Sequence, residues 1–218
     1  MWRCKMNEIK VIDLAAYVTD GEFLLENVTL ENCKVMNLHC DNIVYENCKF
    51  HNVVFDDHFD DHAISSENCE FIHCEFHINF GQSYLTLEDN LFRDCLFENI
   101  NLDYGSGTSY MKGNGFLDCN FMNVKLQGDT EYIDQYIRGG KIENAVFISN
   151  NMNGNQFLEM QFKDVEIGAY FIGNKMYSVS FENVLLKGVL TEMTGANNLN
   201  VFFHCDTSGF RFKDQNEE

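Results

Sequence analysis

The sequence predicts an all-β parallel solenoid whose coils have four short sides. A five-residue period early in the chain fits neither the 3.6-residue repeat of a helix nor the two-residue repeat of a strand. Two apolar series and one asparagine series advance by five: Phe23, Val28, Cys33, Leu38, Ile43, Cys48 and Val53; Leu25, Leu30, Val35, Cys40, Tyr45, Phe50 and Phe55; Asn27, Asn32, Asn37, Asn42, Asn47 and Asn52. A chain that turns a corner every five residues, with two side chains inward each time, builds a solenoid.

The composition agrees with a single domain of this kind. The 218 residues are 45% hydrophobic and include no proline, as expected where nearly every backbone N–H joins a ladder. No apolar run is long enough for a transmembrane helix, and the N-terminal residues lack a signal-peptide core, so a cytoplasmic protein is predicted. Its cysteines are expected to be free thiols, and seven occupy inward repeat positions as small hydrophobic side chains: Cys33, Cys40, Cys48, Cys69, Cys74, Cys95 and Cys119.

The charge balance restricts the partners of the protein. Lysine and arginine total 15 and aspartate and glutamate total 34, so the formal net charge is −19. Direct binding to nucleic acid or to a membrane is not expected, because phosphate groups require a basic surface. Two interpretations of the acidity remain open. It keeps the solenoid soluble and monomeric through self-repulsion, or it binds a partner protein that has a basic surface.

The elements follow in chain order. Residues 1–22 lie outside the register and are expected to cap the N-terminal end, residues 23–212 form the solenoid, and residues 213–218 are a polar tail. Four five-residue sides close a coil of about 20 residues, and the register is interrupted at nearly this interval. The interruptions are therefore predicted to form lateral loops along one edge of the solenoid, at 56–66, 77–84, 103–113 and 127–139.

Four segments carry a resemblance to a known family. They are ENCKFHNVVF (46–55), ENCEFIHCEF (67–76), RDCLFENINL (93–102) and LDCNFMNVKL (117–126). They resemble the pentapeptide-repeat family, and this resemblance implies a right-handed, four-sided parallel β-helix. The family motif places a small residue, then Asp or Asn, then Leu or Phe, then two variable residues. In this chain the position of the small residue often holds Val, Ile, Leu or Met, and insertions separate the groups of repeats. The triangular β-helix of the pectate-lyase type therefore stays open as an alternative.

The resemblance also implies a class of function. The best understood members of the family are similar to B-form DNA in shape and charge and bind type II topoisomerases such as gyrase, and others are modules of secreted bacterial effectors. We therefore expect a bacterial or phage non-enzymatic module that inhibits or protects a nucleic-acid-handling protein, such as a topoisomerase or a defence nuclease. It would act as a monomer or as a dimer through an end of the solenoid. The alternatives are a scaffold or effector-type interaction module without mimicry, and a β-helix carbohydrate-active enzyme.

Acidic and tyrosine side chains of the predicted loops are the candidate partner-binding residues. Tyrosine is favoured at binding surfaces because it offers contact area and a hydroxyl group at a low entropic cost. The candidates are Asp57, Asp60, Asp61, Tyr84, Tyr104, Tyr110, Glu131, Tyr132, Asp134 and Tyr136. The alternative is that these side chains fold back and cover the edge of the coils.

No cofactor, metal or catalytic residue is predicted. Asp57, His58, Asp61 and His62 have the ligand chemistry for Zn, Mn or Ca, but acids alternating with histidines on a loop are more typical of a solvated turn. A lyase or hydrolase would need basic partners for its carboxylates, and these are scarce. The acids considered for such a site are Asp57, Asp61, Asp103, Asp129 and Asp134.

Overall fold

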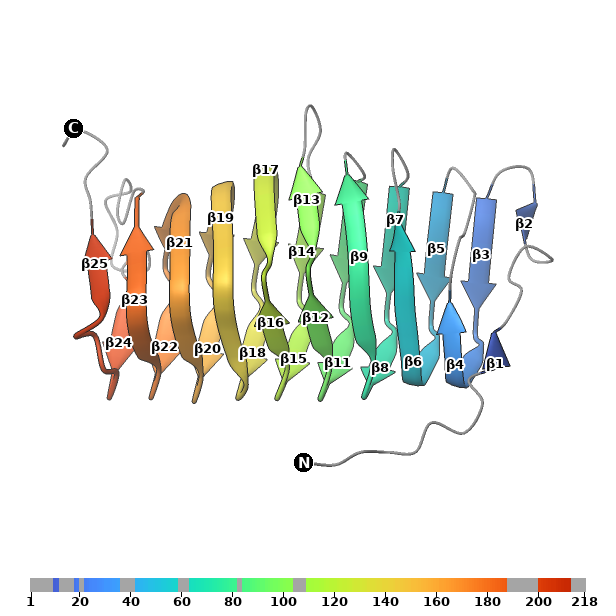
Figure 1. Ribbon diagram of the computed structural model, residues 1–218, viewed down its shortest axis with the longest axis horizontal. Helices are drawn as coiled ribbons and strands as arrows, with labels where there is room; N and C mark the ends of the chain where they lie inside the picture. The colour runs from blue at the N-terminus through green and yellow to red at the C-terminus, as the bar shows by residue number, and fades with distance from the viewer. Residues whose placement is uncertain are drawn as a thin grey trace.

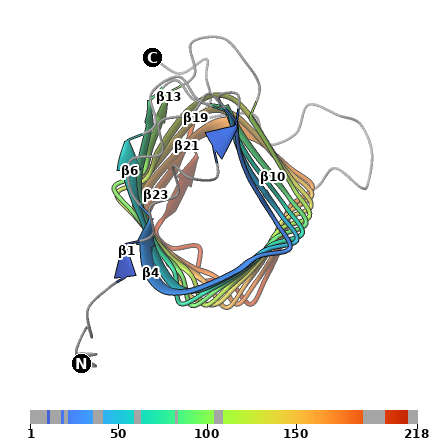
Figure 2. The same ribbon diagram turned by 90° about the vertical axis from the view of Figure 1, so that its right-hand side faces the viewer.

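The protein is a tube of stacked coils built from β-strands. The computed structural model describes residues 10–11, 18–19, 22–35, 42–58, 63–81, 84–103, 109–187 and 200–212. Every regular element in these ranges is a strand, and the strands join in one 25-stranded sheet. Figure 1 shows the coils side by side along the long axis, and the view along this axis shows four sides (Figure 2). The prediction of a four-sided parallel solenoid is confirmed, and the triangular alternative is wrong.

We name the four sides walls A, B, C and D in the order in which the chain passes through them. Wall A consists of β3 (Glu22–Glu26), β5 (Asn42–Glu46), β7 (Ala63–Glu67), β10 (Tyr84–Glu88), β14 (Ser109–Lys112) and the ends of β17 (Lys125–Ile133), β19 (Lys141–Asn153) and β21 (Gln161–Ile172). Wall B consists of the starts of β4 (Thr29–Val35) and β6 (Lys49–His58), then β8 (Glu70–Ile72), β11 (Leu91–Arg93), β15 (Gly115–Leu117), β18 (Tyr136–Arg138), β20 (Gln156–Leu158), β22 (Lys175–Tyr177) and β24 (Val201–Phe203).

Walls C and D complete each coil. Wall C contains later residues of β4 and β6, then the start of β9 (Glu75–Gly81), β12 (Leu96–Glu98), β16 (Asn120–Met122) and the starts of β19, β21 and β23 (Ser180–Leu186). Wall D contains the ends of β6 and β9, β13 (Asn101–Asp103), the start of β17, the middle of β19 and β21, the end of β23, and β25 (Phe210–Phe212). In the predicted N-terminal cap, β1 (Lys10–Val11) pairs with β4, and β2 (Val18–Thr19) forms an antiparallel pair with β3.

Three of the four corners are tight turns with a left-handed residue. At the A–B corner these are Asn27, Asn47, Asn68, Asp89, Gly113, Asp134, Gly154 and Gly173; at the B–C corner Asn32, Asn52, His73, Asp94, Asp118, Gly139, Glu159, Ser178 and His204; at the C–D corner Asn99, Asn123, Asn144, Asp164 and Asn183. Asparagine, aspartate and glycine tolerate a positive φ better than other residues, which explains the asparagine series. The five-residue series does not hold throughout, because Asn42 begins β5 instead of turning a corner.

A substitution at one corner tests this account. Asn47 has a φ of 51°. We expect Asn47→Ala to lower the free energy of unfolding by about 1 kcal/mol, because a β-carbon without a polar group is strained in the left-handed region. Asn47→Gly should be close to neutral, since glycine adopts this conformation without strain. Urea denaturation of both variants provides the measurement, and equal losses in the two would contradict a conformational origin.

The fourth corner, D–A, is where the register is interrupted. The strands that enter three of the breaks, β6, β9 and β13, stack on one another. The strands that leave these breaks, β7, β10 and β14, also stack. The breaks therefore occur at the same corner of successive coils, as their spacing predicted. Further along, β17 and β19 turn this corner as continuous strands with a shift of register.

The predicted loop boundaries are partly wrong. No loop occupies 127–139, because β17 and β18 fill most of this range and pair with the coils on either side. The three other predicted loops are shorter than expected, since strands extend into each of them from both sides. Residues 59–62, 82–83 and 104–108 lie outside the described part of the chain, as do most of the predicted cap and the tail 213–218.

The core consists of ladders of inward side chains. Two phenylalanine ladders line walls B and C, with neighbouring rings nearly parallel and 4.6–4.8 Å apart: Phe50, Phe71, Phe92 and Phe116; Phe55, Phe76, Phe97 and Phe121. The prediction that cysteines pack inward is confirmed for Cys33, Cys48, Cys69, Cys74, Cys95 and Cys119, whereas Cys40 lies outside the described residues. Burial raises the pKa of the Cys69 thiol, which suits a structural rather than a reactive cysteine.

A ladder of buried amides follows the inside of the A–B corner. It consists of Asn90, Asn114, Gln135, Asn155, Asn174 and Asn200, of which the first five are fully buried. Four of its side-chain oxygens accept the backbone N–H of the preceding member, and its amide nitrogens donate to backbone carbonyl oxygens. The ladder therefore satisfies the polar backbone groups that the turns leave inside the tube.

Candidate interaction face

Four glutamates form a straight row on the outside of wall A. Glu26, Glu46, Glu67 and Glu88 are in register across the strands β3, β5, β7 and β10. Adjacent strands of a sheet are about 4.8 Å apart, so three steps extend the row over about 14 Å. We call these four residues the glutamate row. They lie in the N-terminal half of the solenoid, on strands coloured blue to teal in Figure 1.

The local sequence explains why these carboxylates point outward. Each glutamate follows an inward residue of wall A, and successive side chains of a strand alternate between its two faces. Each glutamate also precedes a left-handed residue of the A–B corner. Two of these corner residues orient the row, because Asn27 Nδ2 donates to Glu26 Oε1 at 3.0 Å and Asn68 Nδ2 donates to Glu67 Oε1 at 3.2 Å. Asp89 adds a further exposed carboxylate at the same corner.

Several ion pairs of lysine and arginine lie away from the glutamate row. Those between residues 138 and 187 lie on the other walls and at the B–C corner. The pair of Arg138 with Glu159 is an example, in which the hydrogen bond to Glu159 raises the pKa of Arg138. On the next strand of wall A, β14, the position in register with Glu88 is occupied by Lys112.

The structure places four of the predicted partner-binding residues around the A–B corner, in two successive coils. Tyr110 and Glu131 are register partners on wall A. Asp134 is the left-handed residue of the corner. Tyr136 begins the strand of wall B that follows, and its side chain is 37% exposed. Glu131 and Asp134 therefore place carboxylates near the A–B corner in the coil after Lys112, whereas Ile133 occupies the next position of the row itself.

Tyr132 was expected on the exposed face, and this expectation is wrong. Its side chain is only 8% exposed and lies inside the tube, where its ring meets that of Phe147 at 6.4 Å. The reason is alternation along β17, which directs Glu131 outward and Tyr132 inward. The sequence pattern of acids and tyrosines did not reveal this because the segment was assigned to a loop.

The remaining predicted residues lie partly outside the described chain. Asp60, Asp61, His62 and Tyr104 are among the residues that the structure does not describe. For Asp57, His58 and Tyr84 the structure describes only the backbone. The first two belong to β6, in register with Ile78 and Asn79, and Tyr84 begins β10. The candidate metal ligands therefore stay a prediction.

Sequence reasoning missed the glutamate row, although a signal for it exists. A glutamate followed by asparagine or aspartate recurs at 26–27, 46–47, 67–68 and 88–89, at intervals of 20 or 21 residues.

Within the described ranges, no group of three or more His, Cys, Asp and Glu side chains is arranged to hold a metal ion. The same ranges contain no helix of the length and hydropathy needed to cross a membrane.

Comparison with known proteins relates the chain to solved structures alone. No protein-family model and no curated protein matches it. It is similar to a trypsin-treated form of QnrB1, a plasmid-mediated fluoroquinolone resistance protein, with 16% identity, coverage of 87% of this chain and 89% of that chain, and a TM-score of 0.40. It is also similar to HetL, a pentapeptide-repeat protein involved in heterocyst differentiation regulation from the cyanobacterium Nostoc sp. strain PCC 7120, with 10% identity, coverage of 86% and 90%, and a TM-score of 0.37.

The fold is assigned from the geometry of the chain itself. Its sides are about five residues long, asparagine or aspartate turns most of the tight corners, and two inward side chains per side build the core. Four such sides close each coil, and each strand pairs in parallel with the same side of the next coil. The chain is therefore a four-sided parallel β-solenoid of the pentapeptide-repeat type.

Proposed function

We propose that the protein is a non-enzymatic protein-binding module and that the glutamate row binds a basic groove on a nucleic-acid-handling protein, such as a topoisomerase or a defence nuclease. The row itself carries this proposal. Four carboxylates in register, fixed to a hydrogen-bonded wall, form a regular line of negative charge. A groove that binds nucleic acid is lined with lysine and arginine to match regularly spaced phosphates.

The row works against the stability of the fold. Like charges directly opposite each other on neighbouring strands are destabilising, and two unit charges about 4.8 Å apart repel by roughly 1 kcal/mol in water. Side chains that break a local stability rule without an evident compensating gain are expected at functional sites. The unbalanced row is therefore better explained by a partner than by packing.

Wall C of the same protein shows how the solenoid can neutralise such a row. Glu143, Lys163 and Glu182 are in register on β19, β21 and β23. Lys163 Nζ lies 3.9 Å from Glu143 Oε1 and 3.5 Å from Glu182 Oε1, so each carboxylate has a neighbouring cation. The glutamate row has no lysine between its members. This contrast favours recognition by an external basic surface over a general need for surface charge.

The experiment removes two charges from the middle of the row. Glu46→Gln combined with Glu67→Gln should weaken binding to the partner at least ten-fold and reduce the salt dependence of the remaining affinity, because screening acts on charge pairs across the interface. Stability should stay the same or rise slightly, since repulsion within the row is relieved. Partners captured from a bacterial lysate, together with purified gyrase, provide the binding assay.

A matched control keeps the charge change but moves it to another part of the surface. Glu70→Gln combined with Asp94→Asn removes two charges from wall B and the B–C corner. This variant should retain at least half of the wild-type affinity. Equal losses in both double variants would show that net charge alone governs binding. Binding that resists moderate salt would refute recognition by charge.

A further inference from the structure

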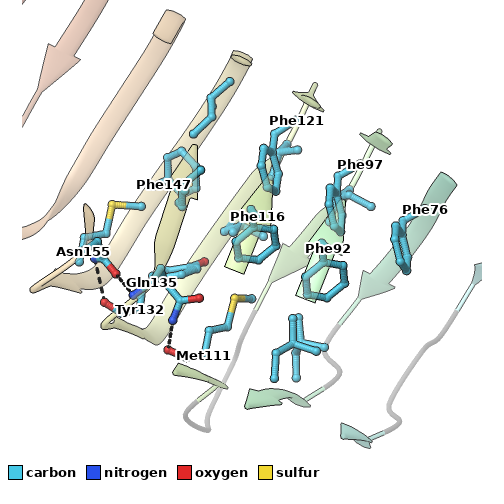
Figure 3. A pocket seen from close by; sticks show the side chains of 18 of the residues that line it. Phe76, Phe92, Phe97, Met111, Phe116, Phe121, Tyr132, Gln135, Phe147 and Asn155 are labelled. Atoms are coloured by element: carbon cyan, nitrogen blue, oxygen red, sulfur yellow. Dashed lines mark hydrogen bonds between the residues drawn. The ribbon is translucent and has the colours of Figure 1, made fainter. Parts of the chain in front are cut away.

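The inside of the solenoid contains an elongated apolar cavity of about 160 Å³. Its lining begins at Tyr45 and ends at Phe162, so the cavity extends along the axis through several coils. Figure 3 shows the phenylalanine rings of walls B and C along one flank and Met111 and Tyr132 on the other. No feature of the proposed interaction face requires this space.

The cavity exists because the four walls are filled unequally. On walls B and C the two phenylalanine ladders meet edge to face, for example Phe92 and Phe97 at 5.5 Å between ring centroids. Wall A contributes smaller or unbranched inward side chains in the same coils, namely Ser66, Leu87 and Met111. These side chains leave the half of the tube opposite the phenylalanine ladders incompletely filled.

A third aromatic ring closes the tube near each end of the cavity. At the N-terminal end Tyr45 lies 5.2 Å from Phe50 and 6.2 Å from Phe55. At the other end Phe157 meets Phe162 at 5.5 Å and Phe171 of the next coil at 6.4 Å. The cavity therefore lies between two sections of the tube in which three rings crowd together.

In the coil before the C-terminal closure, the aromatic filling changes sides. Ile137 and Ile142 replace phenylalanine in both ladders at once. Tyr132 and Phe147 place their rings on walls A and D instead. The cavity continues past this coil, since all four residues line it.

Three polar side chains of the lining, Ser66, Gln135 and Asn155, form hydrogen bonds within the core. Ser66 Oγ donates to Asn90 Oδ1 at 2.9 Å, Gln135 Nε2 donates to the carbonyl oxygen of Met111 at 2.8 Å, and Asn155 Nδ2 donates to that of Tyr132 at 3.0 Å. A charged ligand would lose its hydration without gaining a counter-ion in this environment. The lining therefore selects an uncharged, apolar molecule.

We propose that this cavity binds one small, uncharged apolar molecule of the hydrocarbon class, elongated rather than bulky. The volume sets the size, because a cavity of about 150 Å³ lined by leucine, isoleucine and phenylalanine stays dry and holds benzene or xenon. The shape sets the class, because the lining extends across successive coils about 4.8 Å apart and favours a linear chain of about six carbons over a fused ring system.

Wild-type protein supplies the first test. Xenon should occupy the tube in crystals pressurised with the gas and should give a protein-dependent shift in the xenon NMR spectrum. A ligand that binds only the folded state raises the unfolding temperature. n-Hexane should therefore raise it in proportion to concentration, whereas hexanoate at the same concentration should not. Absence of xenon from the tube, in the crystal and in solution, overturns the proposal.

The second test fills the cavity. Leu87→Phe combined with Met111→Phe adds a third ring to two coils, which reproduces the arrangement of Tyr45 with its two phenylalanine neighbours. The dissociation constant for n-hexane should rise at least ten-fold. Leu91→Phe, which adds the same ring to the outside of wall B, should leave it unchanged. If the filled variant does not fold, xenon binding to the wild type still decides; if it folds and binds n-hexane normally, the assigned site is wrong.

Discussion

Replacing Phe92 with alanine is expected to lower the free energy of unfolding by about 3–5 kcal/mol. Phe92 is 2% exposed and lies in the middle of the wall B ladder. Its ring stacks on Phe71 at 4.6 Å and on Phe116 at 4.8 Å, and it meets Phe97 edge to face at 5.5 Å. The substitution removes the transfer free energy of a buried ring and leaves an enlarged cavity, because hydrogen-bonded walls cannot collapse into the space.

Urea denaturation measures this effect, and an exposed phenylalanine provides the control. Phe203 is 56% exposed on the outside of the last described coil, so Phe203→Ala should change stability by less than about 1 kcal/mol. In a solenoid each coil contacts only its neighbours, and a weakened central coil separates the two halves. A loss below 1 kcal/mol for Phe92→Ala would mean that the ladder does not act as a continuous core.

Replacing Asn155 with alanine is expected to cost about 2–4 kcal/mol, because it leaves buried polar groups without their partners. Asn155 Oδ1 accepts the backbone N–H of Gln135 at 2.9 Å. Its Nδ2 donates to the carbonyl oxygen of Tyr132 at 3.0 Å and to Asn174 Oδ1 at 3.1 Å. Water does not easily replace these bonds, since Asn155 is 1% exposed.

Amide hydrogen exchange makes this second result specific. Exchange at the Gln135 N–H should accelerate strongly in Asn155→Ala, while amides in wall C of distant coils change less. Asn120→Ala on the outer face of wall C serves as the control and should alter stability by at most about 0.5 kcal/mol. If Asn155→Ala were as stable as this control, the amide ladder would be a consequence of packing and not a cause of stability.

The phenylalanine ladder of wall B connects stability with the proposed function, since Phe50, Phe71 and Phe92 lie in the coils that carry Glu46, Glu67 and Glu88. The glutamate row remains a straight line only if β3, β5, β7 and β10 keep their register, and the inward side chains hold that register. A rigid array of charges binds with a smaller loss of conformational entropy than charges on flexible loops. Like-charge repulsion within the row is therefore opposed by a core that resists displacement of one coil against the next.

Much of the fold could be predicted from the five-residue pattern. Leu25, Tyr45, Phe50 and Phe55 were expected to point inward, and all four are buried. The reason is local, because alternation along a strand and a corner residue with positive φ set the direction of the neighbouring side chains. The same local pattern predicted which cysteines are buried and where most of the tight corners lie.

The candidate site depends on the register between successive coils, which the five-residue pattern does not specify. Glu26, Glu46, Glu67 and Glu88 form a row because 20 or 21 residues separate them and the strands that carry them pair in register. Where that corner is turned by continuous strands, as in β17, a segment rich in acids and tyrosines becomes part of the sheet and Tyr132 enters the core.

The amino-acid pattern alone therefore established the walls, the tight corners and the two inward positions of each side. The stacking of coils established which outward side chains are neighbours, where the strands pass through an interruption and which half of the tube stays unfilled. The physical reason is the range of the interactions. Side-chain direction follows from residues next to each other in the chain, whereas register between coils follows from hydrogen bonds between residues about 20 positions apart.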